Sequence, residues 1–105
     1  MKYFFGIDCF SKGIHVVVLD QKSNIRFMEK FISDKVSLSE RITEIELKFE
    51  NFLIEKIMVK NKIEGSTIFI EDAIYIQNPH TTIIISKVIG AITLQLGLYN
   101  FPVIY

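Results

Sequence analysis

The feature that most constrains the fold is the uneven distribution of charge along the 105 residues. Residues 1–64 hold 11 of the 12 basic and 10 of the 12 acidic residues, whereas residues 65–105 hold only Glu71, Asp72 and Lys87. Half of all residues are hydrophobic, which is the opposite of the composition of a disordered chain. The sequence therefore predicts one folded domain over 1–105, with its C-terminal part in the core.

The chain has no formal net charge and a single cysteine, Cys9. Neutrality argues against a highly basic protein that coats nucleic acid. It is compatible with a nucleic-acid enzyme, because acidic metal ligands offset basic contacts in the total. One cysteine excludes an internal disulfide and fits a reducing compartment. The N-terminus carries no visible targeting signal, so we expect a cytoplasmic protein.

Three strands joined by tight turns are predicted first. Residues 3–10 and 14–19 are rich in aromatic and β-branched side chains, which favour strands. Gly13 can take a positive φ in the turn between them, and a second polar turn covers 20–24. Residues 25–32 alternate as in a strand exposed on one face. Such a series is an antiparallel meander, with the third strand near a sheet edge.

The hydrophobic period then changes to that of a helix. Ser37 and Glu40 have the spacing of a capping box, and apolar residues follow every three or four positions. A short apolar run over 67–71 is typical of a strand buried in a parallel sheet. A helix over 79–96 and a strand beginning at 101–105 complete the predicted order β-β-β-α-β-α-β.

The helix over 79–96 is apolar almost all round, which predicts burial on more than one side. Asn78 or Thr81 is its expected cap, and Gly97 its expected stop. The small residues of one stripe leave two alternatives: Gly90 fits against the sheet, or the helix packs on a second copy of the chain. Its length approaches that of a membrane span, but Lys87 and Gln95 interrupt the apolar run, so we expect a buried helix and no membrane.

Two acids stand out because they occupy apolar strands. Asp8 lies between Ile7 and Cys9, and Glu71 ends the run 67–71. A carboxylate in such a place is costly unless it is paired, hydrogen-bonded or bound to a cation. A right-handed crossover would lay the two strands parallel and bring both acids to one sheet edge, where ligands of α/β proteins gather. Two carboxylates there suit Mg²⁺.

Structural explanations compete with this one. Asp8 could cap the turn that follows it, and Glu71 could be an exposed strand end. By alternation, Asp72 points away from Glu71 and is the weaker ligand. His15 lies in an apolar run and is expected to be a half-buried structural residue. Cys9 has no partner at the spacing of a metal site or a nucleophile pair.

Two blocks of sequence resemble RuvC-type Holliday junction resolvases, which belong to the ribonuclease H-like superfamily. Residues 6–13, Gly-Ile-Asp-Cys-Phe-Ser-Lys-Gly, resemble the opening strand and turn of that family. Residues 70–82, Ile-Glu-Asp-Ala-Ile-Tyr-Ile-Gln-Asn-Pro-His-Thr-Thr, resemble its second acid, apolar loop and helix entry. Residues 90–92 and 101–105 continue the match in order, while 22–66 matches only in its pattern of elements.

The resemblance implies a ribonuclease H-like α/β fold, with the meander extended by parallel strands, and a homodimer formed through the helix 79–96. It implies cleavage of four-way DNA junctions that depends on Mg²⁺ or Mn²⁺, in recombination and repair. Asp8 and Glu71 match the family's first two catalytic, metal-binding acids. The positions expected to contact DNA are Ser11, Lys12, Ile74, Tyr75, Asn78 and Lys87.

The chain also departs from the family pattern. The family's two further acids lie on a later helix, which would fall beyond Tyr105, so we expect a nuclease domain that is incomplete at its C-terminus. Cys9-Phe10 stands where the family usually has Pro-Gly. Two alternatives therefore stay open: the RuvC-like N-terminal domain of a transposase, and a catalytically incomplete domain that only binds DNA or dimerises.

Overall fold

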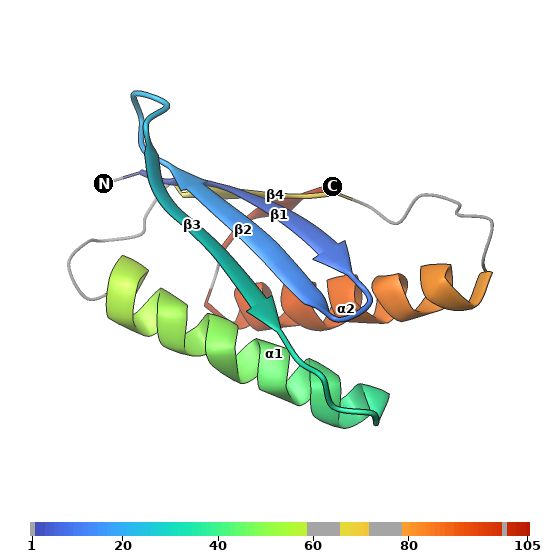
Figure 1. Cartoon of the computed structure of the whole chain (residues 1–105). Coiled ribbons are helices and arrows are strands. Elements are labelled where there is room, and N and C mark those ends of the chain that lie inside the picture. The colour runs from blue at the N-terminus through green and yellow to red at the C-terminus, as the bar shows by residue number, and fades with distance from the viewer. Residues whose placement is uncertain (1, 59–65, 72–78, 100) are drawn as a thin grey trace.

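The computed structural model describes residues 2–58, 66–71, 79–99 and 101–105. Five strands and two long helices occur in the order that the sequence predicts (Figure 1). In chain order the elements are β1 (Phe4–Phe10), β2 (Gly13–Leu19), β3 (Ile25–Ile32), α1 (Leu38–Phe52), its π-helical continuation η1 (Leu53–Met58), β4 (Thr67–Ile70), α2 (Pro79–Leu98) and β5 (Val103–Ile104).

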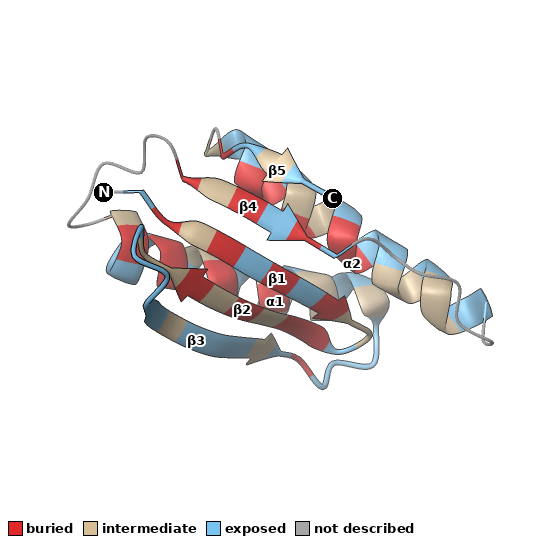
Figure 2. Cartoon of the chain, turned by 90° about the horizontal axis from the view of Figure 1, so that it is seen from above, coloured by how far each residue is buried: buried red, intermediate tan, exposed pale blue. Residues whose placement is uncertain are grey.

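The five strands form one sheet in the spatial order β3-β2-β1-β4-β5. Pairings β1–β2 and β2–β3 are antiparallel, and pairings β1–β4 and β4–β5 are parallel. This confirms the predicted meander and places β3 at one edge of the sheet (Figure 2). The strand β1 is therefore central and carries Asp8 in the middle of the sheet.

Both helices cover the same face of the sheet (Figure 1). Alternate residues of the inner strands point toward the helices and are buried, as the two-residue period of a strand requires. They meet the apolar stripe of α1 and the inner side of α2. The largest fully buried side chains are Phe5, Phe49, Ile14, Ile45, Leu53, Ile57, Ile68, Ile70, Ile92, Leu96, Val16 and Val18.

The opposite face of the sheet is uncovered by any element that the structure describes. Phe69 and Ile104 on this face are each 48% exposed, and Met28 is 56% exposed. The expectation that the run 67–71 is buried on both faces is therefore wrong for the described part of the chain. Its continuous apolar character hides the two-faced environment, because Ile68 and Ile70 face the helices while Phe69 between them does not.

The helix ends differ from the expected ones. Ser37 is the N-cap of α1 but makes no side-chain capping bond, and its hydroxyl lies 3.2 Å from that of Ser39 instead. The predicted capping box is therefore wrong. Gly97 does not stop α2, which continues to Leu98. The amides of Tyr99 and Phe101 then both bond to the carbonyl of Leu96, at 3.1 Å each.

Gly13 is required for a reason other than the expected positive φ. A Cβ atom at this position would overlap the carbonyl oxygen of Phe31 and lie 2.9 Å from the Cα of Ile32. Among the described residues other than glycine, Ser23 adopts a positive φ, at 64°, in the turn between β2 and β3. Gly13 thus permits the end of β3 to approach the β1–β2 hairpin.

The helix α2 is also long and apolar enough to cross a membrane, judged by length and composition alone. Its residues Val88, Ile89, Ile92, Gln95 and Leu96 are buried inside the domain. None of these five lies before Val88, and the part of α2 before Val88 adds the partly buried Ile85 to the side chains that pack against the core.

Candidate functional site

Asp8 and Glu71 lie side by side on neighbouring strands. The parallel register pairs Ile7 of β1 with Ile70 of β4, and the Glu71 amide donates to the Ile7 carbonyl at 3.1 Å. Glu71 therefore takes the next ladder position, beside Asp8, near the carboxyl ends of both strands. Both residues are exposed. The crossover through α1 thus juxtaposes acids that are 63 positions apart in the chain.

The two acids line one shallow depression of 460 Å³ on the uncovered face. Gly6 forms part of its floor, where no atom lies within 4 Å of the place that a Cβ would occupy. Apolar and aromatic side chains form the rest of the walls, among them Val17, Phe69, Ile104 and Tyr105. The site is therefore a pair of carboxylates at the centre of an open and mostly apolar surface, wide enough for an extended ligand.

His15 belongs to the same depression, which the sequence reasoning missed. It is the cross-strand partner of Asp8, and Lys30 of β3 is the partner of His15 in turn. A row of four ionisable side chains thus crosses the uncovered face from β4 to β3: Glu71, Asp8, His15 and Lys30. The two-residue hairpin turn after Phe10 was the signal that could have found it, because turn length fixes the register.

The donor set of the acid pair fits a hard divalent cation. Carboxylate oxygens are the ligands that Mg²⁺ and Mn²⁺ prefer, and Mg²⁺ keeps several waters, so two carboxylates can form part of its shell. Without a cation, adjacent carboxylates repel each other. Among the described residues, no group of three His, Cys, Asp or Glu side chains is placed to hold a metal ion. Asp72 lies outside those residues.

Cys9 is turned away from the site. Its side chain is buried in the core, on the opposite face of β1 from Asp8. Burial, and secondarily the charge of Asp8, raise the pKa of the Cys9 thiol to about 12. The thiol therefore stays protonated near neutral pH, in agreement with the expectation that it is no nucleophile.

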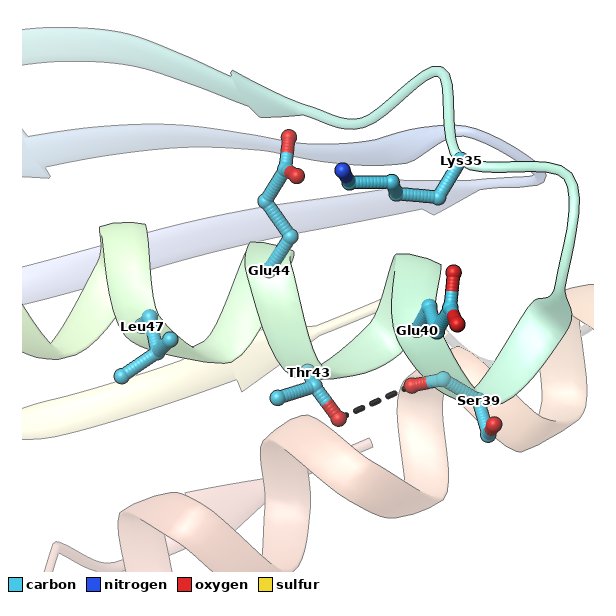
Figure 3. A pocket seen from close by; sticks show the side chains of 6 residues that line it. All are labelled: Lys35, Ser39, Glu40, Thr43, Glu44 and Leu47. Carbon is cyan, nitrogen blue, oxygen red and sulfur yellow. Dashed lines mark hydrogen bonds between the residues drawn. The ribbon is translucent and has the colours of Figure 1, made fainter.

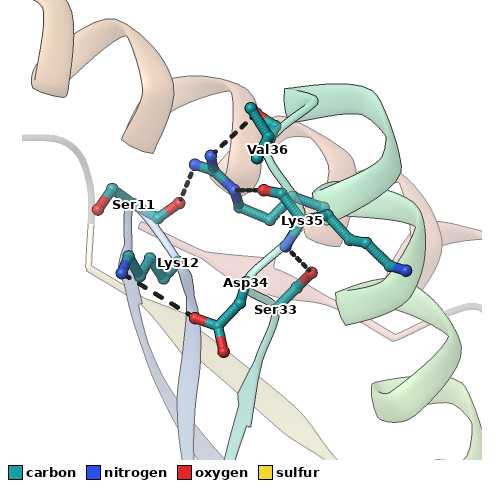
Figure 4. A network of polar contacts seen from close by, with 7 residues as sticks. Ser11, Lys12, Ser33, Asp34, Lys35 and Val36 are labelled. Carbon is teal, nitrogen blue, oxygen red and sulfur yellow. Dashed lines mark hydrogen bonds and ion pairs between the residues drawn. The ribbon is translucent and has the colours of Figure 1, made fainter.

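Ser11 and Lys12 form the tip of the β1–β2 hairpin, close to the segment that follows β3 (Figure 4). The guanidinium of Arg41 donates to the carbonyls of Ser11 and Lys35, each at 3.0 Å. The Ser33 amide bonds to the Lys12 carbonyl at 2.9 Å. The hairpin tip is thus held in place, while the Lys12 ammonium stays exposed, 4.0 Å from Asp34.

The remaining residues that were predicted to contact DNA do not lie at the acid pair or fall outside the described part of the chain. Lys87 is exposed on α2, on the helical side of the sheet and away from the acid pair. Ile74, Tyr75 and Asn78 lie outside the described residues. A different depression, of 450 Å³, runs along α1 and the loop before it, where Lys35, Glu40 and Glu44 alternate with small side chains (Figure 3). Its mixed charges and open walls present no convergent set of ligands.

Comparison with known proteins shows the fold but not the family. No family model matches the chain, and no curated protein matches its sequence. Among solved structures, T. thermophilus RuvC in complex with Holliday junction substrate matches it with a TM-score of 0.78 and 14% sequence identity. The match covers 98% of this chain and 62% of the RuvC chain, so this chain spans under two thirds of its neighbour. The chain therefore has a RuvC-like α/β fold.

Proposed function

We propose that this chain is the N-terminal part of a nuclease domain that cuts four-way DNA junctions by metal-dependent hydrolysis. The observation that carries the proposal is the acid pair: Asp8 of β1 and Glu71, the residue directly after β4, lie beside each other on an uncovered face. The likeness to a RuvC bound to junction DNA supports the choice of substrate. The resemblance in residues 6–13 and 70–82 falls on the same two acids.

In this function, Asp8 and Glu71 hold Mg²⁺ or Mn²⁺, which, when bound, polarises a phosphodiester and lowers the pKa of a water. The carboxylates fix the ion on β1 and β4, elements whose position is set by the buried core. The apolar walls around them face the sugar and bases of a strand. Lys12 and Ser11 of the anchored hairpin contact the DNA backbone, as do Ile74, Tyr75 and Asn78 by resemblance, whereas Lys87 lies on the helical side of the sheet, away from the acid pair.

The helix α2 forms a homodimer in this proposal, which would place two such sites on a junction with two-fold symmetry. Its outward surface supports this, because Ile83, Leu94 and Leu98 are 53%, 69% and 77% exposed. At Gly90 no atom lies within 4 Å of the place of a Cβ. Gly90 therefore does not serve contact with the sheet, which was one of the two explanations for it.

The decisive experiment replaces Asp8 by Asn in the full-length protein. Loss of the carboxylate removes a metal ligand, so we expect Mg²⁺-dependent cleavage of a labelled four-way junction to fall at least ~100-fold. Junction binding, measured by gel shift in Ca²⁺, should persist. Glu71→Gln should behave alike, and Glu55→Gln on η1 is the matched control that keeps full activity. Undiminished cleavage by Asp8→Asn would refute the proposal.

A non-catalytic role is the alternative that one observation favours. Only two acids share the site within the described residues, and a cation held by so few ligands is weakly bound. If the protein binds junctions but never cleaves them in Mg²⁺ or Mn²⁺, it is a DNA-binding or dimerisation domain. Cleavage that requires Asp8 excludes this alternative.

A further inference from the structure

The outer surface of α2 exposes large apolar side chains, among them Ile83, Leu94 and Leu98. The N-terminal half of α2, taken as Pro79–Lys87, begins beyond the strands in both views (Figures 1 and 2), and none of its residues is fully buried. Along the outer side, a single stripe at helical spacing joins this half to the packed half. We call this surface the outer stripe; its residues are Ile83, Lys87, Gly90, Leu94 and Leu98, all exposed.

Next to the outer stripe lies an acidic pocket of 380 Å³ between α1 and α2. Glu46 and Glu50 of α1 form one wall, and Gln95 and Tyr99 form part of the other. The Tyr99 hydroxyl donates to Glu50 Oε1 at 2.9 Å. Neither glutamate forms an ion pair with any described residue. Burial and the neighbouring Glu50 raise the pKa of Glu46, as expected where two carboxylates lack a cation.

Gln95 shows that the pocket lacks a hydrogen-bond donor. Its Nε2 donates to the Glu46 carbonyl at 2.7 Å, which fixes the amide orientation. The residue is 5% exposed, and its Oε1 is buried without a hydrogen-bond partner in the described part of the chain. A buried acceptor without a donor is unusual in native proteins. The pocket thus offers two carboxylates and an amide oxygen, a set that suits an ammonium group with its three donors.

We propose that this pocket receives the Lys87 ammonium of a second copy of the chain. The inference rests on the helix-mediated dimer of the proposed function and specifies its contact. Lys87 is the only lysine or arginine of α2, is exposed, and forms no ion pair among the described residues. The charges of the pocket and of the outer stripe are therefore complementary within one surface, as a self-complementary dimer requires.

Helix geometry makes the contact reciprocal. If two copies of α2 cross antiparallel at Gly90, positions before the crossing face positions after it. Lys87 lies three residues before Gly90 and Leu94 four after it, which is about 4.5 Å and 6 Å along the axis. Lys87 of each copy then lies over the end of α2 that carries Leu94, Gln95 and Leu98 of the other. Gly90 lets the two backbones approach, and each projecting half gains a partner.

Zero-length cross-linking with a carbodiimide tests this contact, since the reagent joins a carboxylate to an amine only when they touch. A mixture of ¹⁴N- and ¹⁵N-labelled full-length protein, without DNA, should give mixed-isotope peptides that join Lys87 to Glu46 or Glu50. Lys87→Arg should keep the dimer in analytical ultracentrifugation but lose this peptide, because the guanidinium does not form the amide. Lys87→Glu should weaken the dimer at least tenfold, and adding Glu50→Lys should restore much of it.

The outcomes separate this inference from the ones it rests on. A dimer without the Lys87 cross-link, and unaffected by Lys87→Glu, overturns the contact but leaves the dimer. A wild-type protein that is monomeric at 100-fold above the concentration used for junction cleavage overturns both, while cleavage that needs Asp8 would still stand. Cross-links from Lys87 to a co-purified basic or acidic protein instead of a second copy would overturn the choice of partner.

Discussion

Single residues in this domain are constrained mainly by what lies against the backbone. Gly13 is needed because the backbone at the end of β3 lies against it. Asp8 is tolerated because its side chain faces away from the core that Cys9, one residue on, helps to fill. The same alternation places Asp8 in the open and Cys9 in an apolar interior. Neighbouring residues thus have opposite chemistry, a reactive carboxylate and an inert thiol, for one geometrical reason.

Gly13→Ala should destabilise the domain by about 1–3 kcal/mol, the range for a side chain forced into filled space. The added methyl meets the Phe31 carbonyl and the Ile32 Cα, which are backbone atoms and cannot turn aside. Urea denaturation followed by circular dichroism measures the change. Gly97→Ala is the control: its place for a Cβ is open, and a helical alanine should leave stability equal or higher by up to about 1 kcal/mol. Equal stability of both variants would contradict a steric requirement for glycine at position 13.

The Cys9 thiol should react with Ellman's reagent only after denaturation, because it is buried and protonated. Its pKa rises from 9.0 to about 12 on folding. Between these values the folded protein keeps a proton that the unfolded chain releases, so stability falls as pH rises through this window, by at most ~1.4 kcal/mol per pH unit. Cys9→Ala should lack this part of the alkaline loss in denaturation curves measured at pH 8–11. Rapid labelling of the native protein would contradict the burial.

The hydrophobic period of the sequence determines which segments become helices and strands, and the register of strand pairing determines where their side chains lie. The sequence reveals the first better than the second. The meander, both helices and the parallel strand were predictable because two- and 3.6-residue periods are strong signals. The burial of β4 was not, since an apolar run reads the same whether one or both faces are covered. The Ser37 cap failed for a local reason: its hydroxyl has a competing partner in Ser39.

The two faces of β4 should respond differently to substitution. Ile68 is fully buried, so Ile68→Ala should cost about 2–5 kcal/mol. Phe69 is 48% exposed on the uncovered face, so Phe69→Thr, which replaces one residue that favours strands by another, should cost less than about 1 kcal/mol. Thermal denaturation of the two variants side by side checks this. A loss at Phe69 as large as at Ile68 would mean that something covers this face in solution.

At the scale of the molecule, the sequence could predict which acids meet but not what surrounds them. Asp8 and Glu71 were identifiable because a right-handed crossover leaves few topologies open. The alignment of His15 and Lys30 with them depends on pairing across β2 and β3, which emerges only from the exact hairpin turns. The acidic pocket could not be predicted either. Its residues Glu46 and Gln95 are 49 positions apart on two different helices, and no local sequence pattern joins them.

The juxtaposition of β1 with β4 also has a consequence for the order of folding. The Tyr3 amide donates to Ser66 Oγ at 3.1 Å across 63 positions of sequence, and the acid pair lies at the far end of the same pairing. The hairpins of the meander need only local closure, whereas this pairing must close a long loop first. The two carboxylates therefore do not exist as a site until the chain has paid that entropy. A cation held by both of them binds only the closed chain, so it would act as a clasp that stabilises the completed sheet over every earlier folding intermediate.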